Sequence, residues 1–216
     1  MEDFADLALM TFTSTMIYRF RCQFFRVALA TLFLLAFDSV SHAQESVFEL
    51  DPAKTKIEFT LGASLHTVHG SFKLKSGTIR FDPSTGAMSG AIVVDARSGE
   101  SGNSSRDKRM HGEILESEQF PEIIFTPKQL KGALVAEGSS KLEVTGQIRL
   151  HGQDHEVSIP VEAQSSVREL EITTSLVVPY VQWGLKNPST FLLRVSNKVT
   201  IDIRASGRMK IVGTPQ

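Results

Sequence analysis

The amino-acid sequence predicts an all-β protein, built as an antiparallel β-barrel of about eight strands, with one short helix from Ser104 to Glu116. Three observations support this prediction. Apolar and polar residues alternate with period two from Val47 onward, which is typical of strands with one dry and one wet face. Short turn sequences separate the alternating runs and favour antiparallel hairpins. One heavily charged segment, residues 98–125, interrupts the alternation.

Residues 1–43 have the layout of a secretory signal peptide. Three arginines within residues 19–26 precede an apolar run at 27–37, and small residues at 41–43 supply a cleavage spacing. The apolar run is too short to span a bilayer. We therefore expect cleavage after Ala43, a secreted or periplasmic location, and one mature domain over residues 44–216.

The start of the chain has a second interpretation. Three acidic residues precede Met16, which is unusual for the start of a signal peptide, so Met16 is an alternative true start. The only cysteine, Cys22, lies before the apolar run, and the mature chain would contain none. Its formal charge would be near zero, which provides no general attraction to nucleic acid or to anionic lipid.

The alternating runs predict the strands one by one. Lys56, Glu58 and Thr60 lie on one face of the first such run, while apolar residues occupy the other face. In chain order, the expected strands lie within residues 56–61, 88–94, 120–125, 141–150, 156–163, 170–177 and 199–205. Turn chemistry is found at 82–87, 136–140 and 151–155. The barrel closes the sheet and removes exposed edges.

Two glycines bear on whether the barrel is hollow. Gly90 and Gly146 fall on the apolar side of their strands, where a filled core would need bulk. Small inward residues leave space for a ligand, and a barrel of about eight strands can hold a small one. The alternative is that each glycine marks a bulge or a tight bend. The sequence leaves both interpretations open.

The charged segment predicts the helix. Ser104 and Asp107 have capping-box spacing, with Asp in place of Glu or Gln. Met110 and Ile114 lie one turn apart and form a narrow apolar stripe. An isolated helix of this length would not form, so it should rest on the barrel as a lid.

Three stretches of sequence point to a known family. They are "FELDPAKTKIEFTL" at 48–61, "DARSGESGNSSRDKRMHGEILESEQFPEIIF" at 95–125 and "VTGQIRLHGQDHEVSIPV" at 144–161. With these motifs the chain resembles the YceI-like family of secreted, lipocalin-like barrels that bind polyisoprenoids. The resemblance covers about residues 47–204. Two segments depart from the family pattern, "GASLHTVHGSF" at 62–72 and the longer "VPYVQWGLKNPSTFLLRVSNKV" at 178–199, in which Trp183 lies in an expected mouth loop.

The resemblance implies that an apolar barrel interior holds a polyisoprenoid or another long-chain lipid. Each buried CH₂ contributes roughly 0.8 kcal/mol, so an apolar tunnel needs no special side chain. The alternation supplies the candidate inward residues, each of which could equally be ordinary core: Phe59, Leu61, Phe72, Leu74, Ile92, Val94, Ile123, Phe125, Val144, Ile148, Ile159, Ile172 and Leu176.

Three cations are candidates for contacts with an anionic head group at the mouth. They are Arg106, Lys108 and Arg109. A solvated helix face explains them equally well. Arg109 and Glu113 have the i,i+4 spacing of a helical ion pair.

The histidines suggest a metal site only weakly. On a strand, His66 and His69 would point to opposite faces, and no His-Glu-x-x-His helix is present. We therefore expect no metal, no cofactor and no enzyme activity. The remaining histidines of the proposed cluster are His111, His151 and His155.

The sequence favours an extracytoplasmic binding or carrier protein for a long-chain lipid. One alternative is a structural or stress-related interaction module with a filled barrel, and another is a metal-dependent hydrolase that uses the histidines. We expect no nucleic-acid partner and only transient membrane contact. The oligomeric state, a homodimer included, stays open.

Overall fold

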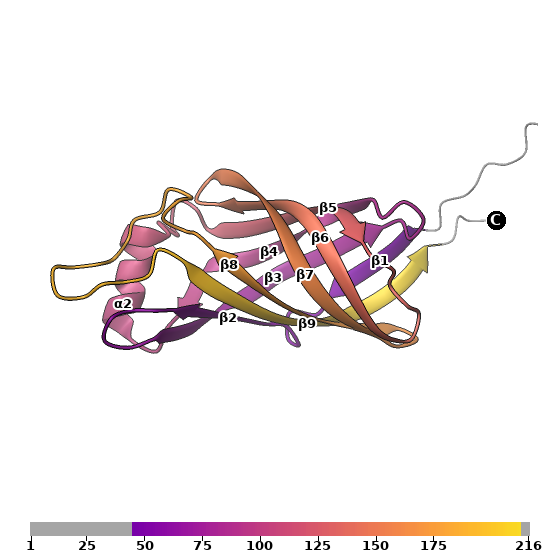
Figure 1. Ribbon diagram of the computed structural model, residues 1–216, viewed down its shortest axis with the longest axis horizontal. Coiled ribbons are helices and arrows are strands. Elements are labelled where there is room, and N and C mark those ends of the chain that lie inside the picture. Colours follow the sequence, from indigo (N-terminus) through magenta and orange to yellow (C-terminus); the bar gives the residue numbers. More distant parts are fainter. Residues whose placement is uncertain (1–44, 213–216) are drawn as a thin grey trace, which may run out of the picture. The chain divides into compact units, whose positions relative to one another are not determined.

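The computed structural model describes residues 45–212 (Figure 1), so the expected signal peptide, the alternative start at Met16 and Cys22 lie outside the described residues. Strands dominate this part of the chain, and one helical segment separates the fourth strand from the fifth. In chain order the elements are β1 (Glu45–Leu50), β2 (Lys56–Leu61), β3 (Val68–Phe81), β4 (Met88–Glu100), α2 (Ser104–Arg109), the π-helical turn η1 (Met110–Ile114), β5 (Glu122–Lys131), β6 (Gly138–Leu150), β7 (Gln153–Ser165), β8 (Glu169–Val178) and β9 (Val199–Val212).

The strands form one closed antiparallel ring. From β2 onward each strand pairs with the next along the chain, and β9 returns to pair with both β1 and β2. Because β1 and β2 lie end to end between β3 and β9, the nine strands fill eight positions in the ring. The prediction of an all-β, lipocalin-like antiparallel barrel of about eight strands is confirmed.

The expected strands are all present, and several are longer than the alternation indicated. Two expected turns were too wide, because residues 138–140 and 153–155 belong to β6 and β7. Cross-strand pairing decides this, since Gly138 pairs with Ser165 and Gln153 with Leu150. Only His151 and Gly152 remain between β6 and β7, with φ of 51° and 75°. Positive φ at both central residues is typical of a type I′ hairpin turn.

The expected helix is present as α2 followed directly by η1. The expected cap at Ser104 was wrong by one residue, because Asn103 is the N-cap and its side chain accepts a hydrogen bond from the amide of Arg106 at 3.0 Å. Asp107 instead accepts a hydrogen bond from the amide of Ser101 at 2.9 Å. The chain therefore enters the helix through an Asn cap, one of the residue types that suit this position best.

The helical segment lies at one end of the barrel. Figure 1 shows α2 beside the long β8–β9 connection, while β1 begins and β9 ends at the opposite end. Among residues 45–212, no helix combines the length and the hydropathy that crossing a bilayer would require.

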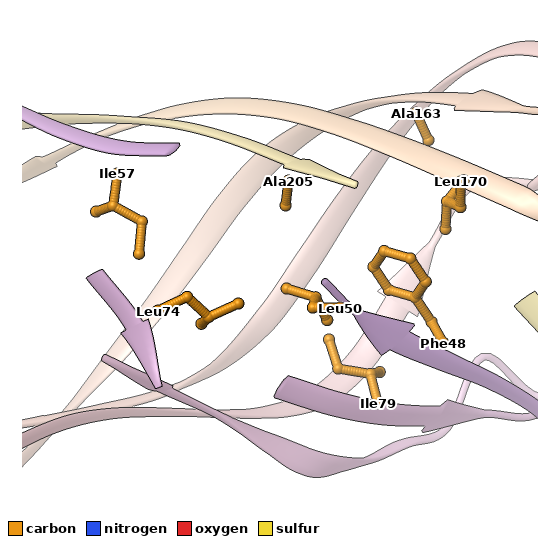
Figure 2. Packing of buried hydrophobic residues seen from close by; sticks show 8 residues of the cluster. All are labelled: Phe48, Leu50, Ile57, Leu74, Ile79, Ala163, Leu170 and Ala205. Atoms are coloured by element: carbon orange, nitrogen blue, oxygen red, sulfur yellow. The ribbon is translucent and has the colours of Figure 1, made fainter. Parts of the chain in front are cut away.

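A packed cluster fills part of the interior (Figure 2). Eight buried side chains from six strands point toward one another there, and Phe48 is only 2% exposed. The members are Phe48, Leu50, Ile57, Leu74, Ile79, Ala163, Leu170 and Ala205. Six members are large apolar side chains and two are alanines, so together they close-pack this part of the interior.

Gly90 and Gly146, which the alternation placed on the inward side, allow neighbouring strands to approach closely and do not line the cavity. A Cβ at Gly90, where φ is 102°, would lie 2.2 Å from the carbonyl oxygen of Thr78. A Cβ at Gly146 would lie 2.5 Å from the carbonyl oxygen of Thr126, beside the register shift near Pro127. Gly146 thus lies opposite a bulge, as one interpretation expected, whereas Gly90 lies in regular register and serves a close approach of the two strands instead.

Candidate functional site

The interior of the barrel contains a cavity of about 630 Å³. Side chains from all nine strands, from α2 and η1, and from the β8–β9 connection form its wall. Pockets for small ligands commonly have volumes of about 300–1,000 Å³. This volume does not fit the alternative of a filled barrel.

All thirteen apolar residues that the alternation placed inside lie on the cavity wall. On neighbouring strands they also pair in register, as Ile92 does with Phe125 and Val94 with Ile123. Five of the thirteen are at most 9% exposed and also belong to the buried core, namely Phe59, Leu74, Val144, Ile148 and Ile159. Direct contact of these residues with a ligand stays a prediction.

Other wall residues could not be found from alternation. Tyr180, Trp183 and Leu193 come from the β8–β9 connection, and Met110 comes from η1. These segments have no period-two pattern. Helical spacing with Ile114 did indicate Met110, and Trp183 was expected in a mouth loop, but the signal for Tyr180 and Leu193 was only their aromatic or apolar character. Tyr180 is buried, which raises the pKa of its phenol, and its hydroxyl donates to the carbonyl oxygen of Ser196 at 2.6 Å.

Polar wall residues gather at the helical end of the cavity. Ser101, Ser105, Arg106 and Arg109 come from α2 and the residue that follows β4, and His66 comes from the β2–β3 connection. Of the three predicted head-group contacts, Arg106 and Arg109 thus lie on the wall, whereas Lys108 is exposed and lies away from it. The cavity wall is apolar almost throughout, and its charged residues lie at the helical end, while Thr55 and Thr174 add polar groups elsewhere. We call the helical end, with these charged residues, the polar end of the cavity.

Arg106 is held in place by the residue that precedes the helix. Its Nε donates to Ser101 Oγ at 2.7 Å, and its Nη2 donates to the Ser101 carbonyl oxygen at 2.7 Å. Neither bond uses Nη1. A guanidinium fixed in this way is oriented before a ligand arrives, which reduces the entropy lost when an anion binds.

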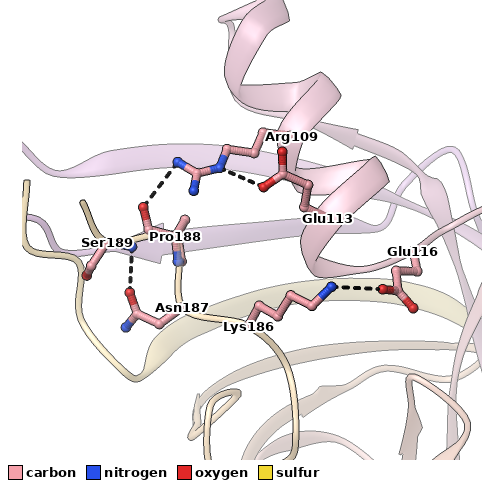
Figure 3. Close-up of polar contacts among 7 residues, drawn as sticks. All are labelled: Arg109, Glu113, Glu116, Lys186, Asn187, Pro188 and Ser189. Atoms are coloured by element: carbon pink, nitrogen blue, oxygen red, sulfur yellow. Dashed lines mark hydrogen bonds and ion pairs between the residues drawn. The ribbon is translucent and has the colours of Figure 1, made fainter. Parts of the chain in front are cut away.

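Polar contacts tie the helical segment to the β8–β9 connection (Figure 3). The predicted Arg109–Glu113 pair is confirmed at 3.0 Å, and Arg109 Nη1 also donates to the carbonyl oxygen of Pro188 at 3.2 Å. A second contact follows just beyond the end of η1, where Glu116 Oε1 lies 3.4 Å from Lys186 Nζ of the connection. We call Arg109, Glu116, Lys186 and Pro188 the lid clamp.

Glu116 is the acidic centre of this clamp. Its second oxygen lies 3.0 Å from His151 Nε2, so the carboxyl group also contacts the β6–β7 turn. The hydrogen bond with His151, and then that with Lys186, lowers the pKa of Glu116 below its ordinary value of 4.5. The charged form of Glu116 thus favours its contacts with His151 and Lys186.

The histidines do not form a metal site among the described residues, since no group of three or more candidate ligands occurs there. His69 contacts Thr60 Oγ1 at 3.2 Å, and His111 Nε2 lies 2.8 Å from the carbonyl oxygen of Gly99. His155 stacks on Trp183 with ring centroids 4.2 Å apart. Each histidine therefore has a separate local environment, which leaves the metal-dependent hydrolase without support from the geometry.

Comparison with known proteins places this architecture in a known group. A family model described as a YceI-like domain matches residues 48–206. A UPF0312 protein of Vibrio campbellii is 31% identical over 143 residues, which are 64% of this chain and 71% of that protein. A UPF0312 protein of Vibrio vulnificus is 28% identical over 141 residues, with 63% and 71% covered.

Solved structures share the fold at low sequence identity. A polyisoprenoid binding domain from Saccharophagus degradans, implicated in plant cell wall breakdown, has a TM-score of 0.58 and 14% identity, with 76% of this chain and 98% of that chain covered. BcnA of Burkholderia cenocepacia has a TM-score of 0.60 and 18% identity, with 73% and 98% covered. A YceI protein of Campylobacter jejuni has a TM-score of 0.55 and 17% identity, with 68% and 88% covered.

Proposed function

Because the chain belongs to the YceI-like domain family, we propose that it binds a polyisoprenoid or a similar long-chain amphiphilic lipid inside the barrel. One solved structure with the same fold is a polyisoprenoid binding domain. The proposal rests chiefly on the cavity of about 630 Å³, whose body is lined by apolar side chains.

The wall of the cavity suits a long hydrocarbon chain. Removal of each CH₂ from water contributes roughly 0.8 kcal/mol, so affinity would grow with chain length until the cavity is full. The polar end would receive the head group, with Arg106 and Arg109 as the cationic contacts. Lys108, exposed and away from the wall, has no part in this proposal.

The proposed place of action lies outside the cytoplasmic membrane, where the protein would carry lipid through an aqueous compartment. The arginines, apolar run and small residues of 1–43 support this location. A closed barrel with its apolar wall turned inward supports a carrier, since it would shield a lipid tail from water.

Lipid extraction tests the proposal directly. The protein, purified gently from the fraction into which it is secreted, should release a prenyl or other long-chain lipid detectable by mass spectrometry. Ile92→Arg should abolish uptake, because Ile92 lines the cavity and a guanidinium there would be buried without a partner. Val93→Arg is the matched control, because Val93 is the next residue on β4 and is absent from the cavity wall.

The control separates blockage of the cavity from damage to the strand. We expect the Val93→Arg variant to take up added prenyl alcohol as the parent protein does, and circular dichroism to show both variants folded. Uptake by a folded Ile92→Arg variant would contradict the proposal. The proposal would also be contradicted if the parent protein is repeatedly purified without bound lipid and has no affinity for prenyl chains.

A further inference from the structure

An exposed apolar tip lies at the helical end of the barrel. Phe191, Leu192 and Leu65 are 93%, 83% and 77% exposed. They come from two connections that run side by side, since the amide of Ser64 donates to the carbonyl oxygen of Arg194 at 2.8 Å. In Figure 1 the β8–β9 connection projects beyond α2 at this end. We call Phe191, Leu192 and Leu65 the apolar tip.

The tip is held by a defined turn. The amide of Thr190 donates to the carbonyl oxygen of Leu193 at 2.8 Å, and Thr190 Oγ1 accepts a hydrogen bond from the amide of Leu193 at 3.1 Å. Phe191 and Leu192 are therefore the two central residues of the turn. Gly, Asn, Asp, Pro and Ser usually occupy such positions. The two large apolar side chains there are exposed to solvent, and the geometry of the turn does not require them.

The same connection contributes to the tip and to the cavity. Leu193 and Val195 line the cavity, whereas Phe191 and Leu192 are exposed on the outside. Leu193 directly follows Leu192 in the chain, so the tip lies at the rim of the cavity wall. A surface that receives the tip would therefore also face the polar end of the cavity.

The charged residues of the two connections that form the tip are all positive, and one of them, Lys186, is paired with Glu116 of the helical end. Residues 62–67 and 179–198 contain no Asp or Glu, while Lys186, Arg194 and Lys198 lie in the second segment and are exposed. Basic residues close to an anionic bilayer are attracted to its surface. Apolar side chains flanked by such residues are typical of segments that insert into the interfacial layer of a membrane.

We propose that the apolar tip docks the helical end of the barrel onto an anionic lipid bilayer, with Phe191, Leu192 and Leu65 inserted and Arg194 and Lys198 at the head groups. The docking rests on the tip and on its charges. Its purpose, the transfer of lipid between the bilayer and the cavity, rests on the proposed function.

Co-sedimentation with vesicles tests the docking. The parent protein should bind vesicles of phosphatidylcholine with phosphatidylglycerol more tightly than vesicles of phosphatidylcholine alone. Phe191→Ser with Leu192→Ser should weaken this binding by at least about tenfold without loss of the fold, because both side chains are exposed and Ser suits a turn. Val167→Ser is the matched control, since Val167 is 79% exposed in the β7–β8 connection, and it should bind as the parent does.

A polarity-sensitive fluorophore gives a second readout. Attached to the single cysteine of a Leu192→Cys variant in a Cys22→Ser background, it should shift to the blue with anionic vesicles, whereas a label at Val167→Cys should not. Equal binding by the parent and the double Ser variant, or a label at 192 that stays in water, would overturn the docking. So would cross-linking of Leu192→Cys between two copies without vesicles, which would assign the tip to a dimer interface.

The two proposals fail in different ways. Uptake of a prenyl alcohol delivered in detergent needs the cavity but not the tip, so the double Ser variant should retain it. If the parent takes up this lipid but does not co-sediment with vesicles, the docking proposal is wrong and the proposed binding function stands. If the parent binds vesicles but takes up no lipid, the docking stands and the binding function is wrong.

Discussion

At Gly90 the backbone of β4 passes so close to β3 that no side chain fits between the two strands. The carbonyl oxygen of Thr78 occupies the space that a Cβ would need, and φ of 102° is unfavourable for any residue with a side chain. The glycine thus allows this close approach of two paired strands. At the residue scale, a glycine on the inward side of a strand can be required by the close approach of two backbones, while other residues of the same strand line the cavity.

Gly90→Ala should therefore destabilise the barrel by at least about 1 kcal/mol, because the native conformation is incompatible with a Cβ. Gly112→Ala is the control, since a Cβ there meets no atom within 4 Å. In the helical segment it should leave stability unchanged or raise it by up to about 1 kcal/mol. Urea unfolding followed by circular dichroism measures both. Similar midpoints for the two variants would contradict the close-approach argument.

The helical segment depends on its neighbours at the scale of elements. Neither α2 nor η1 contains a buried residue, and so short a helix does not form alone in water. Partly buried Ile114 and Leu115 pack against a hydrophobic cluster of the barrel, and the lid clamp adds polar contacts to this attachment. His111 adds another, since its Nδ1 lies 3.0 Å from the buried Ser117 Oγ. Neutralisation of Glu116 weakens its polar contacts with Lys186 and His151, whereas apolar packing does not depend on this charge.

Acid should loosen the lid before it unfolds the barrel. The pKa of Glu116 is lowered in the folded protein by His151 and Lys186, so its stabilising contribution is complete above the ordinary value of 4.5. The contribution is lost as the pH falls from about 4.5 through the lower folded pKa of Glu116. In that window the protection of the amides of residues 110–121 against hydrogen–deuterium exchange, expressed relative to the intrinsic exchange rate at each pH, should fall.

Two variants isolate the role of this carboxylate. The amides of residues 110–121 in Glu116→Gln should be less protected than in the parent already at neutral pH and should lose little further protection in acid. The exposed Glu118→Gln, two residues later, should behave like the parent. Exchange in Glu116→Gln that matches the parent throughout would show that Glu116 does not hold the lid.

At the largest scale, residues 45–212 form a closed ring whose seam joins the two ends of this part of the chain. β1 pairs with β9, and the packed cluster draws on six strands around the ring. A ligand in the cavity would contact strands on every side. Binding should therefore stabilise the barrel as one cooperative unit.

A long-chain prenyl alcohol should raise the melting temperature of the parent protein. At a free concentration of about 100 times Kd the gain is about 2.7 kcal/mol, which corresponds to a shift of roughly 5–10 °C for a domain of this size. The Ile92→Arg variant should show no shift, because its cavity is blocked. Equal shifts in both proteins would indicate that the lipid binds outside the barrel.

Several features of this protein follow from the sequence alone. The period of two, as in residues 56–61 and 141–150, determines strands with one apolar face, and the thirteen inward candidates follow from the parity of all such runs together. Turn residues at 82–87 and the apolar stripe of Met110 and Ile114 likewise predict a hairpin and a short helix from local chemistry. These properties depend on neighbours within a few positions along the chain.

Only the tertiary structure decided how the ring closes and what its ends present. Nothing local to β1 or β2 indicates that they share one position between β3 and β9. The cavity volume depends on packing around the whole ring, and the lid clamp joins residues distant in sequence. The exposure of Phe191 and Leu192 likewise follows from the turn that holds them, because an apolar residue in an irregular segment can face either inward or outward. Long-range contacts leave no periodic signal in the sequence, and they determine the cavity and its rim.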